Sequence, residues 1–353
     1  MIFHRNLLLI FFLFIFPIVL GISTAEATVE RRAALDIGSG KAKLTIADLN
    51  PSNNRIVKVI HTEFARINFA KSLLNNPDNL LDDDIYAEAC EKIIMLRDLA
   101  VKKGAVKMMT VATEAFRKAS NGIEFLRRLE DAAGVPIQMI SQEDEAILGF
   151  DTAVQATGYP WETLISWDSG SSSLQLTTKS DEGVVDYLAP CGTTPATHLL
   201  LELKGLCFGK GSTPNPITFE EAIAFVEQMH NALPEPSGIF KNKLHREKTK
   251  FVGIGDFNST IGICARAIGK DLFSAQELWD GILLLLEKND EDLIDRDADT
   301  SAWVVLPRLL LTFSVMSKLG IEYVEWIETN GNGLGILVND HYWKNASTPS
   351  TLS

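Results

Sequence analysis

The chain has 353 residues, of which 46% are hydrophobic and 22% are charged, and its formal net charge at pH 7 is −13. This length is enough for two domains with separate cores, and the composition is that of a folded protein rather than a disordered or fibrous one. The acidic excess disfavours a nucleic-acid partner, whose backbone it would repel. It does not exclude an anionic substrate, because backbone amides and a divalent cation can bind phosphate against an unfavourable overall field.

The first 27 residues have the pattern of a signal peptide. Arg5 precedes an uninterrupted apolar run over residues 7–20, and small residues at Ala25 and Ala27 suit cleavage after Ala27. The alternative is an uncleaved membrane anchor, since the apolar run is close in length to a spanning helix. We therefore expect an exported, periplasmic bacterial protein whose only contact with the membrane is this segment.

The four cysteines are an even number in a compartment where disulfides form. Their spacing is not that of a zinc site. Two alternatives stay open, which are a disulfide between Cys191 and Cys207 and free, buried thiols.

The first half of the mature chain opens as a β-meander and then alternates helices with strands. A glycine- and serine-rich turn at Gly38–Gly40 separates the first two strands. Apolar residues then recur at helical spacing between short apolar runs, which indicates a parallel α/β sheet. The predicted strands are residues 33–37, 43–47, 56–62, 107–112 and 135–140, and the predicted helices run near 85–99, 123–129 and 143–154.

The opening pattern returns at Leu164, where an apolar strand leads into the turn Asp168–Ser173 and a second, alternating strand. Two copies of one unit predict duplicated α/β domains that face each other across a ligand-binding cleft. We assign domain I to residues 28–158 and domain II to residues 159–345. Domain II continues with predicted strands at 184–188, 250–254 and 324–328, helices at 197–204, 219–233, 275–286 and 303–319, and a final turn at 330–335.

Each of the two hairpins begins with an aspartate. A turn of glycine and serine exposes backbone N–H groups, against which a phosphate can sit. The aspartate cannot bind phosphate directly, but it can hold Mg²⁺ beside the phosphate oxygens. The candidate phosphate-binding residues are Gly38, Ser39, Gly40, Gly170, Ser171 and Ser172, and the candidate Mg²⁺ ligands are Asp36 and Asp168.

Three segments carry a family resemblance, which are residues 34–39 (ALDIGS), 111–117 (VATEAFR) and 140–146 (ISQEDEA). In order and spacing the chain resembles the exopolyphosphatase / guanosine-pentaphosphate phosphohydrolase family over about residues 32–338. That family belongs to the actin, sugar-kinase and Hsp70-like superfamily. The resemblance implies two ribonuclease-H-like domains with the active site in the cleft between them.

The resemblance also implies roles for individual residues. Glu145 matches the family's catalytic glutamate, which would orient or deprotonate the water that attacks the terminal phosphorus. Arg117 matches an arginine whose guanidinium could hold phosphate oxygens. Lys43 stands where many members have arginine, and Gly192 matches a glycine of a Pro-x-Gly segment and is a further candidate for phosphate binding.

The second domain departs from the family pattern at three places. Gln175 replaces the glutamate that closes the family's second hairpin, and an amide cannot act as a base. Asp256 puts a negative charge where the family has Gly-Gly-Thr, and residues 329–335 lack the charges of the family's last motif. We therefore expect hydrolysis to be slow or altered.

The sequence thus predicts an exported phosphoanhydride hydrolase that uses Mg²⁺ to release terminal phosphate from polyphosphate. Export argues against guanosine pentaphosphate, which is made and used in the cytoplasm. The alternative is a non-catalytic protein of the same fold that binds or senses polyphosphate or a nucleotide. Glu145 and Asp36 favour the enzyme, whereas Gln175 and Asp256 favour the binder. The sequence leaves open whether the protein forms a homodimer.

Overall fold

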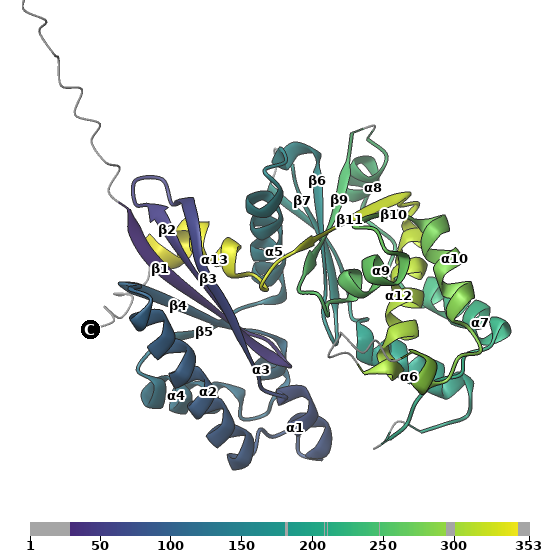
Figure 1. The fold of residues 1–353 in the computed structure, drawn as a ribbon, viewed down its shortest axis with the longest axis horizontal. Coiled ribbons are helices and arrows are strands. Elements are labelled where there is room, and N and C mark those ends of the chain that lie inside the picture. The colour runs from purple at the N-terminus through teal and green to yellow at the C-terminus, as the bar shows by residue number, and fades with distance from the viewer. Residues whose placement is uncertain are drawn as a thin grey trace, which may run out of the picture.

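The computed structural model describes residues 29–180, 183–207, 209, 211–246, 248–293 and 301–344. The predicted signal peptide and its cleavage site lie outside these residues. The described chain forms two lobes, each built on one mixed β-sheet with helices packed against it (Figure 1). The predicted α/β class is therefore confirmed.

The first lobe contains a five-stranded sheet in the order β3-β2-β1-β4-β5. The first three strands are antiparallel, and β4 and β5 run parallel to β1. The strands are β1 (Glu30–Ile37), β2 (Lys41–Asn50), β3 (Arg55–Arg66), β4 (Lys107–Ala112) and β5 (Ile137–Met139), and the helices are α1 (Phe69–Asn75), α2 (Asp83–Lys102), α3 (Glu114–Lys118) and α4 (Gly122–Ala133).

Local sequence explains why α2 forms and where it begins. The side chain of Asp82 accepts a hydrogen bond from the backbone N–H of Ile85, which satisfies one of the unpaired donors of the first turn. The buried positions of the helix follow a spacing of three and four residues, so one face packs into the lobe's core. Those positions are Ile85, Ala89, Ile93, Leu96 and Ala100.

The second lobe repeats this topology. Its six strands lie in the order β10-β11-β9-β6-β7-β8, so that β8, β7, β6, β9 and β11 occupy the places of β3, β2, β1, β4 and β5, with β10 added at the edge. Its strands are β6 (Leu164–Ser169), β7 (Leu174–Ser180), β8 (Gly183–Ala189), β9 (Lys250–Gly255), β10 (Leu272–Ser274) and β11 (Tyr323–Glu328). Its helices are α6 (Thr193–Leu203), α7 (Phe219–Ala232), α8 (Gly238–Leu244), α9 (Thr260–Ile268), α10 (Ala275–Leu285), α11 (Asp290–Leu293) and α12 (Val305–Leu319), with short 3-10 turns η1 (Trp161–Thr163) and η2 (Ala302–Val304).

Two helices cross between the lobes. α5 (Gln142–Thr157) follows the first sheet but packs against the second through Phe150 and Ala153. α13 (Gly333–Val338) follows the second sheet but returns to the first, where Ile336 and Leu337 join the core, and α14 (Asp340–Lys344) follows it. Figure 1 shows α5 and α13 side by side between the two sheets. The lobes are thus tied at one end, and the cleft opens from there.

The structure corrects the predicted final turn at 330–335. The chain turns only as far as Asn332, and α13 begins at Gly333. A Cβ atom at Gly335 would lie 2.1 Å from the carbonyl oxygen of Leu148, so only glycine allows α13 to pack this closely on α5. Helix α9 is a second difference, because no element was predicted over residues 260–268.

Helix α12 with η2 is apolar and long enough to cross a membrane, but 67% of that window is buried inside the second lobe. It is the core helix of this lobe. All four cysteines are free thiols, so Cys191 and Cys207 are not bridged. The alternative of free, buried thiols holds for Cys191 and Cys264, whereas Cys207 is exposed and Cys90 is partly exposed.

Candidate active site

A cavity of about 1120 Å³ lies in the cleft and draws its walls from both lobes. The first lobe contributes Asp36, the Gly38–Gly40 turn, Lys41, Lys43 and Glu145. The second contributes Asp168, the Gly170–Ser171 turn, Thr193, Asp256 and Arg308. The two predicted hairpins therefore face one space.

The two hairpins have the same geometry. The N–H of Gly38 donates to the carbonyl of Lys41 at 2.9 Å, and the N–H of Gly170 donates to the carbonyl of Ser173 at the same distance. In strand register Asp36 lies opposite Lys43, just as Asp168 lies opposite Gln175. The sequence repeat is thus a repeat of backbone geometry around the cavity.

The carbonyl oxygens of both turns accept hydrogen bonds from neighbouring backbone segments. The oxygens of Ser39 and Gly40 accept from the N–H groups of Ala70 and Ile67 at 3.0 and 3.1 Å. In the second hairpin the oxygens of residues 170 and 171 accept from the first amides of α6 at 3.2 and 2.7 Å. The N–H groups of residues 39, 40, 171 and 172 have no acceptor in the described part of the chain, and they are available to an anion.

Gly192 lies behind the second hairpin and is not part of the cavity wall. A Cβ atom there would come within 2.6 Å of the carbonyl oxygen of Gly170 and 2.7 Å of the backbone nitrogen of Ser172. The close approach lets the start of α6 bond to the turn. Gly192 therefore shapes the hairpin from behind.

Asp36 is buried and is held by the last turn of the chain. Its Oδ2 accepts from the N–H of Asn332 at 3.0 Å. Gly331 has φ +63°, and a Cβ atom there would lie 2.6 Å from the same oxygen. Asn330 extends the contact, because its amide donates to the carbonyl of Leu44 at 2.8 Å. The final turn thus reaches across the cleft and fixes the first aspartate.

Asp168 lies in β6, and burial raises the pKa of its carboxyl to about 6. The charge of Lys43 opposes this shift, while the charge of Asp36 adds to it. Opposite Asp168, the buried amide of Gln175 donates to the hydroxyl of Ser173 at 2.9 Å. Gln175 therefore completes the hairpin without adding a third negative charge.

Glu145 projects from the first turn of α5, which Ser141 caps by accepting from the N–H of Asp144. Its carboxylate accepts from Nη2 of Arg117 at 3.0 Å, and Nη1 of Arg117 donates to the carbonyl of Ile140 at 2.8 Å. Arg117 does not line the cavity, and its ion-pair partner is Glu145. This arginine fixes the direction in which Glu145 points.

Burial raises the pKa of Glu145 to about 8, although its side chain is still 16% exposed. The positive charge of Arg117 lowers this pKa, but the charges of Asp168 and Asp36 raise it. Three carboxyl groups thus compete for one region of the cavity. With a pKa near 8 this carboxyl is mostly protonated at neutral pH in the empty cavity, and it can take a proton from a water molecule only in its ionised form.

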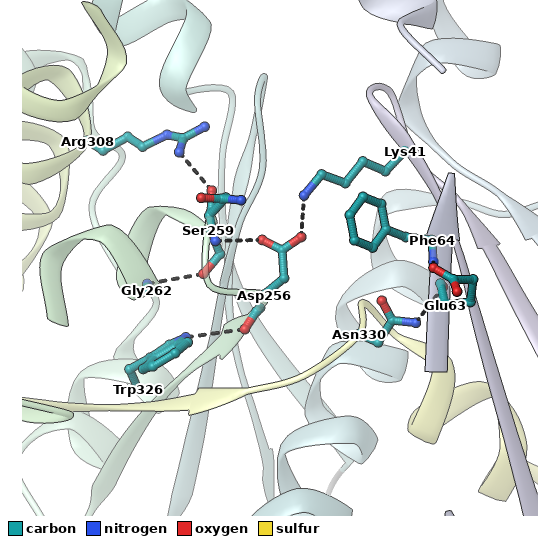
Figure 2. Close-up of polar contacts among 11 residues, drawn as sticks. Lys41, Glu63, Phe64, Asp256, Ser259, Gly262, Arg308, Trp326 and Asn330 are labelled. Carbon is teal, nitrogen blue, oxygen red and sulfur yellow. Dashed lines mark hydrogen bonds and ion pairs between the residues drawn. The ribbon is translucent and has the colours of Figure 1, made fainter. Parts of the chain in front are cut away.

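Asp256 joins the two lobes through an ion pair. Its Oδ2 lies 2.5 Å from Nζ of Lys41, and its Oδ1 accepts from the N–H of Asn258 at 2.9 Å. Burial raises the pKa of Asp256, but Lys43 and Lys41 together hold it below its usual value. Figure 2 shows Lys41 reaching from the first lobe to this carboxylate across the cleft. The charge of Asp256 is therefore matched by the hairpin lysines.

A divalent cation fits the donor atoms near the two aspartates. The described residues contain no group of three or more His, Cys, Asp or Glu that could hold a metal. Mg²⁺ commonly needs only one or two carboxylates, because water and substrate phosphate complete its shell. Asp36 and Asp168 would supply the carboxylates, and the buried Oδ1 of Asn332 is an oxygen with no hydrogen-bond partner among the described residues. A cation bound here would neutralise the negative charge of the two aspartates and would give Oδ1 of Asn332 a partner.

The cavity also contains charged and polar residues that were not predicted as site residues, and Lys41, Arg308 and Asn332 are among them. Arg308 had a signal in the sequence, because it is the only charged residue in the apolar run from Ala302 to Phe313. A single arginine in an otherwise apolar helix is expected to reach polar groups or solvent, because charged side chains are rarely buried without a partner. Lys41 and Asn332 had no local signal, since their place depends on how the lobes meet.

Comparison with known proteins identifies the relatives of this chain. Residues 46–201 match the model of the Ppx/GppA phosphatase family. Over 156 residues the chain is 26% identical to proteins named exopolyphosphatase 1 from Mycobacterium tuberculosis and Mycobacterium leprae. That alignment covers 43% of this chain and 43–44% of the relatives, so less than half of their length is matched.

Solved structures extend the likeness to nearly the whole chain. The Ppx/GppA family member from Aquifex aeolicus superposes with a TM-score of 0.69 at 19% identity, covering 91% of this chain and 100% of that one. An exopolyphosphatase from Cytophaga hutchinsonii gives a TM-score of 0.67 at 14% identity, covering 87% and 96%. At such identities the likeness establishes the fold, and the predicted pair of actin-like domains is confirmed.

Proposed function

Because this chain belongs to the Ppx/GppA phosphatase family, we propose that it hydrolyses phosphoanhydride bonds and releases the terminal phosphate of polyphosphate. The observation that carries the proposal is Glu145. Its carboxyl is fixed by Arg117 at 3.0 Å, has a pKa raised to about 8 by burial, and borders a cavity that the two hairpin turns also line.

In the proposed reaction the terminal phosphate lies against the free amides of Ser39, Gly40 and Ser171. In its ionised form, which a bound cation would favour by lowering the pKa, the Glu145 carboxylate accepts a proton from a water molecule as the water oxygen bonds to phosphorus. The bond to the bridging oxygen then breaks. The shortened chain leaves with the electron pair of that bond. Arg117 keeps Glu145 from turning away, so it acts by positioning the base.

A divalent cation such as Mg²⁺, when bound, would neutralise phosphate oxygens as charge moves to the leaving group. Asp36 and Asp168 would hold it, with the side-chain oxygen of Asn332 beside them. Lys43 lies close enough to lower the pKa of Asp168, and so keeps this carboxylate ionised as a ligand. Removing metal with a chelator is expected to abolish turnover and to leave the fold intact.

The test is phosphate release from long-chain polyphosphate with Mg²⁺, by the wild type and by Glu145→Ala. The substitution is expected to lower kcat by about 10²- to 10⁴-fold, which is the usual loss on removing a general base. Glu143→Ala is the matched control, because it removes an exposed carboxylate from the same helical turn. Equal rates in the wild type and Glu145→Ala would contradict the role of Glu145.

A second candidate is a non-catalytic protein that binds polyphosphate or a nucleotide. The observation in its favour is Gln175, whose buried amide is bonded to Ser173 where a second catalytic carboxylate would otherwise stand. Polyphosphate binding by the wild type without phosphate release, with or without Mg²⁺, would establish this candidate in place of the hydrolase.

We also propose that the protein is exported, as the pattern of residues 1–27 predicts, or anchored by that segment. Polyphosphate rather than guanosine pentaphosphate is then the expected substrate. The amino-terminal sequence of the mature protein decides between cleavage after Ala27 and an uncleaved anchor.

A further inference from the structure

Arg308 is a cavity residue to which the proposed reaction has assigned no role. It lies in the first turn of α12, on the wall that the second lobe presents to the cleft. Its Nε donates to the hydroxyl of Thr193 at 3.0 Å, and its Nη1 donates to the carbonyl of Asn258 at 2.8 Å. Both acceptors are neutral.

The guanidinium has no carboxylate partner within ion-pair distance in the described part of the chain. It carries five N–H groups in a fixed plane, of which two have acceptors there. Burial lowers its pKa to about 10, and the charge of Asp256 is the main influence that keeps it charged. A partly desolvated cation without a counter-ion is costly to hold, so its place in an anion-binding cavity calls for an anionic ligand.

The contacts of Arg308 place it beside the second hairpin. Thr193 accepts from Arg308 through its hydroxyl and donates its own N–H to the carbonyl of Gly170 at 3.2 Å. One residue therefore bridges the guanidinium and the turn that would hold the terminal phosphate. Through Thr193, the position of Arg308 is fixed relative to the turn that would hold the terminal phosphate.

The electrostatic neighbours of Arg308 differ from those of the catalytic carboxyl. Arg308 is attracted by Asp256, whereas Glu145 responds to Arg117 and the two hairpin aspartates. Arg308 and Glu145 line the same cavity but are held by different neighbours. Figure 2 shows Lys41 and Arg308 approaching the loop of Asp256 from opposite sides, so that positive groups of both lobes flank this loop.

We propose that Arg308 binds the phosphate next to the one being cleaved, and so makes the site specific for a phosphoanhydride chain over a single phosphate group. This inference rests on the proposed function. A planar guanidinium with unused N–H groups can grip two oxygens of one phosphate. Lys41, released from Asp256 by the incoming negative charge, would face the same phosphate from the first lobe.

The kinetic test compares the wild type with Arg308→Gln, using inorganic tripolyphosphate and a nucleoside triphosphate as chains from two sources. KM is expected to rise about 10- to 100-fold for at least one chain, since a charge-assisted bond to phosphate is lost. The kcat should change by less than about threefold, because the contact is made equally in the ground and transition states. Inhibition by orthophosphate, which occupies only the terminal site, should not change.

Two further variants control this comparison. Arg128→Gln removes a surface cation that stacks on Tyr86, outside the cavity, and is expected to leave KM unchanged. Arg308→Lys keeps the charge without the planar fork and should give an intermediate KM, which also serves if Arg308→Gln fails to fold. An unchanged KM for both chains in these Arg308 variants would overturn the inference, as would an equal loss of orthophosphate binding.

Failure of the hydrolase proposal and failure of the Arg308 inference give different results. If the wild type releases no phosphate, the hydrolase proposal fails, and calorimetric binding of tripolyphosphate still tests Arg308. Weaker tripolyphosphate binding by Arg308→Gln, with unchanged orthophosphate binding, would then support the second-phosphate site. Equal tripolyphosphate binding by both proteins would reject it.

Discussion

The substitution Glu145→Gln should make the protein less sensitive to rising pH. Glutamine has nearly the shape of glutamate, and its side-chain oxygen can still accept from Arg117. What it removes is a carboxyl whose pKa is raised from 4.5 to about 8, first by burial and then by the charges of Asp168 and Asp36.

The sign follows from proton linkage. Between pH 4.5 and pH 8 the folded protein keeps a proton on Glu145 that the unfolded chain has lost, so the wild type loses stability as pH rises through this window. The free energy of unfolding falls by about 1.4 kcal/mol per pH unit for one group that is protonated in the folded protein and ionised in the unfolded chain. Glutamine does not titrate. Its free energy of unfolding relative to the wild type should therefore increase by about 2–3 kcal/mol between roughly pH 5.5 and 7.5.

The assay is urea unfolding of both proteins at several pH values in the presence of a chelator, since a bound cation would lower the pKa of Glu145. Titrating groups that do not interact with Glu145 contribute equally to the two proteins and cancel in the difference, which leaves Glu145 and its coupling to Asp168 and Asp36. Glu143→Gln, which removes an exposed carboxylate of the same turn, should stay parallel to the wild type. A constant gap between Glu145→Gln and the wild type across this pH range would refute the reasoning.

Three other predictions follow from the charges and close contacts of the cleft. Asp256→Asn should lower KM for polyphosphate about three- to tenfold, because Lys41 loses its partner and becomes free for phosphate; an unchanged KM would contradict this. Gly331→Ala should cost about 1–3 kcal/mol more in urea unfolding than Gly158→Ala, since both have φ near +65° but only the first would push a Cβ atom against the first hairpin's aspartate. Gln175→Glu should lose about 3 kcal/mol of stability without metal, because it buries a charge opposite the second aspartate, and Mg²⁺ should raise its thermal midpoint more than that of the wild type.

The two hairpins and the duplicated sheets could be predicted because their causes are local. Alternating apolar residues and a turn of glycine and serine specify antiparallel strands, and the same pattern returned at Leu164. Helix α5 could be placed from helical spacing, and its capping residue Ser141 confirms the start. Glu145 was then singled out by its family motif. The turn predicted at 330–335 was wrong in its second half, because the packing of α13 on the far lobe decides its conformation.

The sequence by itself determined the α/β class, the repeat, and which carboxylate to examine, since these depend on residue type and on neighbours along the chain. Only the tertiary structure decided that Arg117 holds Glu145, that Lys41 pairs with Asp256, and that Arg308 lines the cavity with no carboxylate partner among the residues that the structure describes. A pKa or an ion pair depends on charges brought together from distant segments. Those distances exist only after the two lobes have closed on each other across α5 and α13.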